Sequence, residues 1–184
     1  PTNSVRDPDG NDTGWLKDSG GGEKFNDFME NELIPYIDKN YPTSPYRTYV
    51  GHSFGGLSVI NTLITRPELF NNYIAIDPSL WWDDQVILKK AVTVFSESKF
   101  DKKSLYLGIA NTMPDGMKIE DVVHDTTGST LQIRSNLEFA KLADNQESNG
   151  LSFDWKYYDN DTHGSVPLIT EYNAMRFLFS WYDF

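Results

Sequence analysis

Residues 51–55 read GHSFG, a G-x-S-x-G pattern with Ser53 at its centre, and Gly56 follows at once. A serine hydroxyl attacks an ester carbonyl when a neighbouring base removes its proton. The pattern is typical of a serine on a turn so tight that only glycine fits beside it. These residues therefore indicate nucleophilic attack on an acyl carbon, the first step in making or breaking an ester.

The residues around the pattern predict the elements that would position Ser53. Residues 47–50, RTYV, are rich in β-forming side chains, and Leu57, Ile60 and Ile64 lie on one face of a helix after the turn. A strand, a sharp turn and a helix together form a nucleophile elbow. The start of the helix would direct backbone N–H groups at developing negative charge. The alternative is a chance occurrence in a loop, and the flanking elements favour the elbow.

A serine nucleophile needs a base, and the chain has three histidines. His52 lies inside the elbow, where its side chain should point away from the nucleophile and line the pocket or support the structure. His124 falls in a predicted loop and is expected to be solvated. His163 follows the last predicted strand, and in enzymes built on this elbow the base comes last in chain order. We therefore predict that His163 is the general base.

The rest of the chain predicts alternating strands and helices. Strands are expected at residues 47–50, 72–76, 104–110 and 151–158. Helices are expected at residues 23–39, 57–64, 85–94, 131–144 and 167–181. Residues 1–22 are polar and glycine-rich and should form a loop or arm, and Pro35 should kink the first helix near its end. This alternation predicts a single α/β domain with a mostly parallel sheet between helical layers.

Composition limits the classes of partner. The 184 residues carry a net charge of −11, which disfavours nucleic acid and an anionic membrane surface as partners. No apolar run approaches the roughly 20 residues of a membrane span. The absence of cysteine excludes disulfides, thiolate metal sites and a cysteine nucleophile. No zinc motif or phosphate loop occurs, so no metal and no cofactor are expected, and the expected partner is a small-molecule ester.

Three stretches resemble the putative-esterase family of the α/β-hydrolases, which includes esterase D-like enzymes and ferric-siderophore (trilactone) esterases. They are GHSFGGLSVI at 51–60, IDPSLWW at 76–82 and THGSVP at 162–167. The resemblance runs from about residue 22 to the C-terminus. It implies an α/β-hydrolase fold, Ser53 as nucleophile, His163 as base and the backbone N–H of Phe54 as an oxyanion donor.

The sequence departs from the family pattern in two ways. Such esterases have several strands before the elbow strand, and the residues ahead of Arg47 read as a loop and one helix. The chain is therefore expected to be the C-terminal, catalytic part of a longer hydrolase, lacking the N-terminal strands and one oxyanion donor, and to form an oligomer that covers an open sheet edge.

The second departure concerns the carboxylate that would orient His163. Topology favours Asp115, the first carboxylate after the strand that precedes the histidine strand. The alternatives are other carboxylates, or a Ser–His dyad oriented by an amide or a backbone carbonyl. These candidates are Asp77, Asp125 and Asp161, and Asn111 for the dyad.

Trp81 and Trp82 follow the strand next to the elbow strand, at the sheet edge where ligands bind in such folds. With His52 they are candidates for the wall of a substrate pocket, although packing in the core is equally compatible with a tryptophan pair. The function predicted is a serine esterase. An acyltransferase would use the same residues, and a binding domain without activity would keep the motif alone.

Overall fold

The computed structural model describes residue 14 and residues 19–144 and 149–180. Its strands are β1 (Thr48–His52), β2 (Asn72–Ile76), β3 (Lys103–Ala110) and β4 (Leu151–Tyr158). Its α-helices are α1 (Gly22–Phe28), α2 (Ile34–Asn40), α3 (Phe54–Thr65), α4 (Trp82–Glu97), α5 (Ile119–Val122), α6 (Leu131–Asp144) and α7 (Val166–Leu178). A π-helix, η2 (Met29–Leu33), joins α1 to α2, and a 3₁₀ turn, η3 (Gly128–Thr130), precedes α6.

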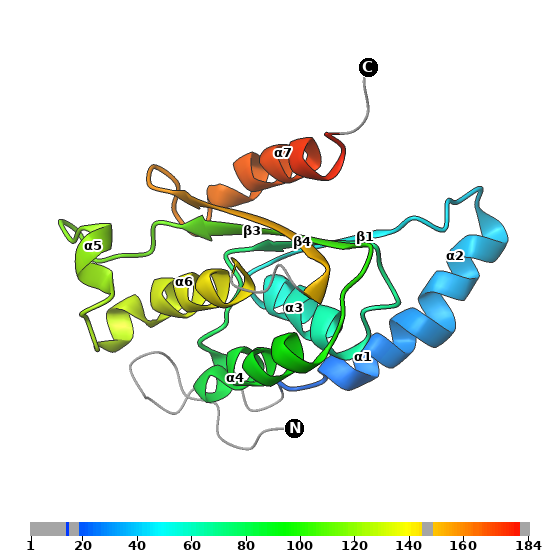
Figure 1. Cartoon of the computed structure of the whole chain (residues 1–184), viewed down its shortest axis with the longest axis horizontal. Coiled ribbons are helices and arrows are strands. Elements are labelled where there is room, and N and C mark those ends of the chain that lie inside the picture. Colours follow the sequence, from blue (N-terminus) through cyan, green and yellow to red (C-terminus); the bar gives the residue numbers. More distant parts are fainter. Residues whose placement is uncertain (1–13, 15–18, 145–148, 181–184) are drawn as a thin grey trace.

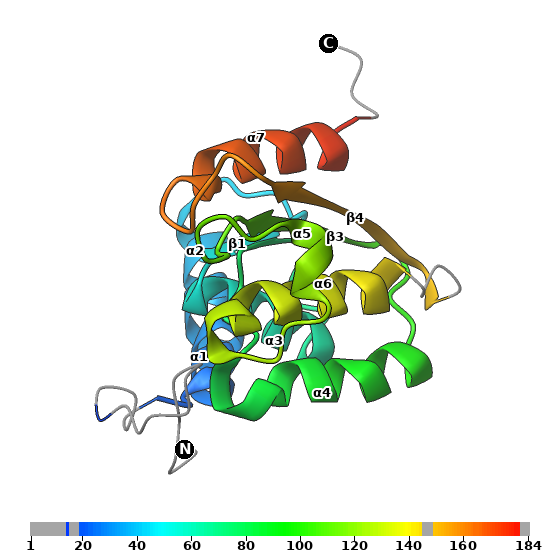
Figure 2. The same cartoon turned by 90° about the vertical axis from the view of Figure 1, so that its left-hand side faces the viewer.

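The four strands form one parallel sheet in the order β1-β2-β3-β4. Helix α7 covers one face, and α3, α4 and α6 lie on the other (Figures 1 and 2). This is the three-layer α/β fold that the alternating pattern predicted. Because all strands run the same way, their carboxyl ends meet at one edge, and the segments after them are brought together there.

The central strands are apolar because both of their faces are covered. Every residue of β2 is buried, and so are the last six residues of β3. The side chains of β2 alternate between two clusters: Tyr73 and Ala75 pack under α3, and Ile74 and Ile76 pack under α7. The core thus fixes the ends of β1, β2 and β3 relative to one another.

The first predicted helix is present as α1, η2 and α2 in succession. Pro35 has no N–H to donate and would disturb a regular α-helix, so a kink was expected. In the structure the wider π turn of η2 directly precedes α2, whose first turn holds Pro35. A proline is tolerated in a first helical turn, where its missing N–H costs little. The helical path therefore continues to Asn40.

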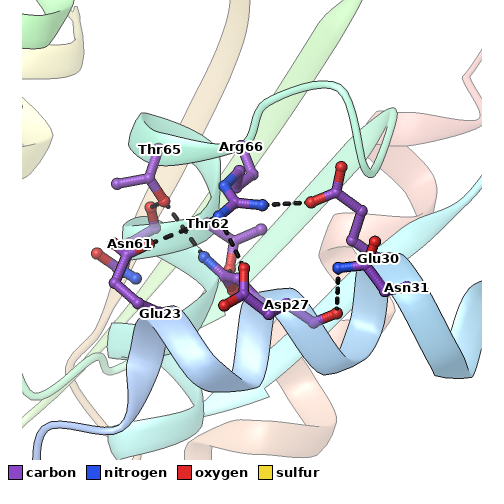
Figure 3. Close-up of polar contacts among 9 residues, drawn as sticks. Glu23, Asp27, Glu30, Asn31, Asn61, Thr62, Thr65 and Arg66 are labelled. Atoms are coloured by element: carbon purple, nitrogen blue, oxygen red, sulfur yellow. Dashed lines mark hydrogen bonds and ion pairs between the residues drawn. The ribbon is translucent and has the colours of Figure 1, made fainter.

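Helix α1 is fastened to the end of α3 by polar contacts (Figure 3). The Arg66 guanidinium bonds Asp27 at 2.9 Å and pairs with Glu30. The buried Asn26 side chain accepts from Thr62 at 2.8 Å and donates to Thr65 at 3.3 Å. These bonds hold the end of α1 and the start of η2 against the helix that follows Ser53.

The other predicted elements fall close to the observed ones, with a few differences. Most of the arm predicted at 1–22 lies outside the described residues, and Gly22 already belongs to α1. The prediction missed α5, η2 and η3 because each is too short to show a periodic pattern. Helix α4 begins at Trp82 instead of Gln85, and its first turn is left-handed, with positive φ at Asp83–Gln85. Among the described residues, no helix is long and apolar enough to span a bilayer.

Candidate active site

Ser53 occupies a strained turn between β1 and α3. Its φ of 59° and ψ of −119° are rare for a residue with a side chain. Hydrogen bonds fix the turn on both sides. The Ser53 N–H donates to the Ile76 carbonyl at 3.0 Å, and the Ser53 carbonyl accepts from Leu57 at 2.9 Å and from Ser79 at 3.1 Å. The nucleophile elbow predicted from the sequence is therefore present as a conformation.

The turn explains why position 51 is glycine. A Cβ there would overlap the carbonyl group of Gly55, which is backbone and cannot swing aside. We expect Gly51→Ala to lower the free energy of unfolding by about 3 kcal/mol or more, since the elbow must shift to admit one methyl group. Denaturant titration of both proteins measures this.

The matched control is Gly55→Ala in the same motif. A Cβ at Gly55 meets no atom within 4 Å, and the residue lies in the first turn of α3. We expect this variant to unfold within about 0.5 kcal/mol of the unmodified chain. Equal losses for the two alanines would contradict the steric explanation.

His163 lies in the loop after β4 and pairs with a carboxylate from another strand. Its Nδ1 is 2.5 Å from Oδ2 of Asp77, the residue that directly follows β2. Asp77 is fully buried, whereas the His163 side chain is 42% exposed. The His163 imidazole is thus anchored on the protein side and open on the solvent side, the arrangement that a group exchanging protons with a substrate requires.

Among the described residues, the carboxylate of Asp77 has three hydrogen bonds besides its contact with His163. Oδ1 accepts from the Ala110 N–H at 3.1 Å and from Asn136 Nδ2 at 3.0 Å. Oδ2 accepts from Gln132 Nε2 at 3.1 Å in addition to facing His163. The residue has a φ of 38°, a left-handed conformation that aspartate tolerates better than most residues. Both oxygens therefore face donors only, and the carboxylate has one orientation.

The acid predicted from topology, Asp115, is not the one beside His163. Asp115 is exposed in the loop between β3 and α5. The other carboxylates have local partners: Asp125 accepts from Thr127 and Thr130, and Asp161 accepts from Ser165. Asn111, considered for a dyad, donates to the Asp159 carbonyl. Asp77, kept as an alternative from the sequence, replaces Asp115 as the partner of His163.

The sequence analysis missed the two amides that hold Asp77. Gln132 and Asn136 lie four residues apart on α6, so they share one face of that helix. The apolar side chains of Ile133 and Phe139 face the core from the same helix. A pair of amides at helical spacing beside the buried side chains was the available signal, since buried polar groups require partners.

A second hydroxyl and two aromatic rings lie beside Ser53. Oγ of the buried Ser79 is 3.3 Å from Oγ of Ser53. The Phe54 ring meets the Trp81 ring edge-on, with centroids 5.9 Å apart. Trp82 is only 8% exposed and belongs to the core, yet it also lines a cavity. Of the predicted pocket residues, Trp81 therefore lies against Phe54, the residue that follows Ser53.

His52 packs against the predicted base. The two imidazole rings have centroids 4.4 Å apart, and Nε2 of His52 is buried with no hydrogen-bond partner among the described residues. Burial, and then the neighbouring His163, lower the pKa of His52 below its usual value of 6.5. The folded chain therefore favours neutral His52.

This shift predicts a pH dependence of stability. A histidine with a lowered pKa binds its proton more readily in the unfolded chain, so the free energy of unfolding should fall as the pH drops below about 6.5. Denaturant titrations at pH 7.5 and 5.5 should show a smaller loss in His52→Gln than in the unmodified chain. His124→Gln, at an exposed histidine, should keep the full loss. A full loss in His52→Gln would refute this account.

The described residues contain no group of three His, Asp or Glu side chains arranged to hold a metal ion. The arrangement that they do contain is an elbow serine, a partly exposed histidine and a buried carboxylate at the carboxyl edge of one parallel sheet. The model of the family described as Putative esterase matches residues 8–165. This chain belongs to that family.

Named relatives and a solved structure agree with the family. The chain is 38% identical over 104 residues to the ferri-bacillibactin esterase BesA of Bacillus subtilis, covering 56% of this chain and 35% of that protein. It is 40% identical over 82 residues to the siderophore triacetylfusarinine C esterase of Aspergillus fumigatus, covering 44% and 28%.

An IroE-like serine hydrolase from Shewanella oneidensis superposes with a TM-score of 0.82 at 35% identity. The match covers 94% of this chain and 52% of that one. The match thus spans well under two thirds of each of the three proteins. The likeness to this solved structure confirms the α/β fold predicted from the sequence.

Proposed function

We propose that this member of the esterase family hydrolyses carboxylic esters, with Ser53 as nucleophile, His163 as general base and Asp77 as the acid that orients it. The observation that supports this most strongly is the 2.5 Å contact between His163 and the buried Asp77, at the sheet edge that also carries the elbow. A buried, fully bonded carboxylate behind a partly exposed histidine fixes both the ring and its tautomer.

The reaction follows from these positions. Asp77 accepts a hydrogen bond from the Nδ1–H of His163, which leaves Nε2 free to take the proton of the Ser53 hydroxyl as Oγ attacks the ester carbonyl. The negative charge on the carbonyl oxygen develops near the start of α3, where the Phe54 N–H is the proposed donor. His163 then gives its proton to the leaving alcohol. Water then attacks the acyl carbon while His163 takes one of its protons, and that proton passes to Oγ of Ser53 as the acid leaves.

The relatives suggest the class of ester. Two of the curated relatives are named for the hydrolysis of siderophores, ferri-bacillibactin and triacetylfusarinine C. We propose that the natural substrate is likewise an ester of a siderophore. The net charge of −11 repels anions and therefore favours a neutral substrate over a polyanion.

The test is covalent labelling of the chain with a fluorophosphonate probe, beside turnover of 4-nitrophenyl acetate. Peptide mapping of the labelled protein should place the adduct on Ser53. A folded chain that neither reacts with the probe nor turns over the ester would overturn the proposal and leave a binding domain. Products that partition toward an added alcohol instead of water would identify an acyltransferase with the same residues.

A further inference from the structure

A cavity of about 390 Å³ lies between α1, α3 and α4, outside the Ser53–His163–Asp77 group. That volume is in the range of small-molecule sites. One side is a single face of α3, formed by Phe54, Leu57, Ser58 and Asn61 at helical spacing. Neither Ser53 nor its two partners line this cavity.

The cavity begins beside the nucleophile. Phe54 directly follows Ser53, lines the cavity, and its ring touches the ring of Trp81. Trp81 lies two residues after Ser79, whose Oγ faces that of Ser53. From Phe54 to Asn61 the wall follows α3 for about 10 Å, at 1.5 Å a residue. A substrate whose carbonyl is at Ser53 could therefore extend one arm of about that length along α3.

The lining fits an uncharged ring. Apolar and aromatic side chains dominate it: Phe25, Phe54, Leu57, Trp82 and Ile87. Among the described residues of the lining, Glu23 is the only charged one, and it disfavours an anionic ligand. Aromatic walls bind rings through large contact areas and edge-to-face geometry.

Two polar groups in the lining have no partner among the described residues. These are the indole Nε1 of Trp82 and the hydroxyl of Ser19, and both atoms are buried. Because no solvent reaches either atom, a ligand oxygen could bond to one of them only if the lining moved. Trp82 also precedes the left-handed turn at Asp83–Gln85, and such strained segments cluster at ligand clamps.

The two walls have a fixed spacing. Arg66 at the end of α3 bonds Asp27 and Glu30 on the α1 side, so the helix that carries Phe25 is tied to the helix that carries Phe54 (Figure 3). A cavity between elements that are bonded to one another is preorganised for a ligand, which lowers the cost of binding.

We propose that this cavity is the subsite for an uncharged aryl group of the ester, on its acyl or its alcohol side. The assignment rests on the proposed esterase function, because it supposes that the ester carbonyl lies at Ser53. To that function the assignment adds the chemical class of one arm of the substrate and the residues that would select it.

The test compares methyl acetate with methyl benzoate and benzyl acetate, followed by pH-stat. Ile87→Trp narrows the cavity, and Val92→Trp places the same ring on α4 outside the lining, at a half-exposed position. We expect Ile87→Trp to lower kcat/KM for one or both aryl esters about tenfold relative to methyl acetate, a change of about 1.4 kcal/mol. Val92→Trp should leave that ratio unchanged.

Should Ile87→Trp fail to fold, the pair Phe25→Ala and Phe28→Ala replaces it. Both rings are on α1 and more than 40% exposed, but only Phe25 lines the cavity. If the variants still cleave methyl acetate and none of the lining substitutions changes the ratio of kcat/KM for the aryl esters to that for methyl acetate, the subsite proposal is wrong.

A separate binding measurement distinguishes the two proposals. Benzamide has an aryl ring and a carbonyl oxygen but no ester, and saturation-transfer NMR can report its binding to the unmodified chain. Binding that Ile87→Trp abolishes, in a chain that cleaves no ester, would keep the cavity as an aryl site and overturn the esterase function. Binding that Ile87→Trp leaves intact would overturn the subsite itself.

Discussion

Replacement of Ser53 by alanine is expected to lower kcat for ester hydrolysis by about 10⁶-fold and to abolish labelling by a fluorophosphonate. The reason is that no other hydroxyl occupies the strained turn, with φ of 59°, that presents Ser53 at the sheet edge. His163→Ala should cost about as much, and the double variant should lose little more, because nucleophile and base act as one unit. Single-turnover and steady-state kinetics measure these losses.

Ser79 provides the matched control. Its Oγ is only 3.3 Å from that of Ser53, yet it lies on the segment after β2 and is 3% exposed. Ser79→Ala should keep both the label and most of the turnover. If Ser79→Ala loses the label and Ser53→Ala keeps it, the nucleophile is Ser79 and the proposal is wrong.

The fold could be predicted because each element carried its own local pattern. Strands β2 and β3 are apolar runs bounded by turn residues, and α3 and α6 show apolar faces at helical spacing. What escaped prediction depended on contacts between elements. The left-handed turn at Asp83–Gln85 follows no local rule, and one of its side chains, Gln85, is held by a bond to Ser135 on α6.

The site could be predicted only in part, for the same reason. Ser53 carries a motif, and His163 was found from its place after the last strand. The acid has no motif, so the choice among carboxylates rested on chain order. In the structure Asp77, the residue directly after β2, contacts His163, while Asp115 lies five residues beyond the end of β3.

The contrast between Asp77 and Asp115 predicts the second large effect on the rate. Asp77→Asn should lower kcat/KM by about 10⁴-fold, because the amide would stabilise the wrong tautomer of His163. The amide oxygen must take the place of Oδ1, where Ala110 and Asn136 both donate. Its NH₂ group then faces Nδ1 of His163, which must accept instead of donate. The proton of the imidazole moves to Nε2, which can no longer take the proton of Ser53.

Asp115→Asn is the matched control, at an exposed carboxylate, and should leave the rate unchanged. Because the new NH₂ group also faces the donor Nε2 of Gln132, Asp77→Asn should lose about 1–3 kcal/mol of stability as well. Rates are therefore compared at a temperature where circular dichroism shows both variants folded. If Asp77→Asn then keeps its rate within tenfold and Asp115→Asn does not, the 2.5 Å contact is structural and the acid lies elsewhere. A rate lost only in the folded Asp77 variant identifies the buried carboxylate as the group that sets the direction of proton transfer.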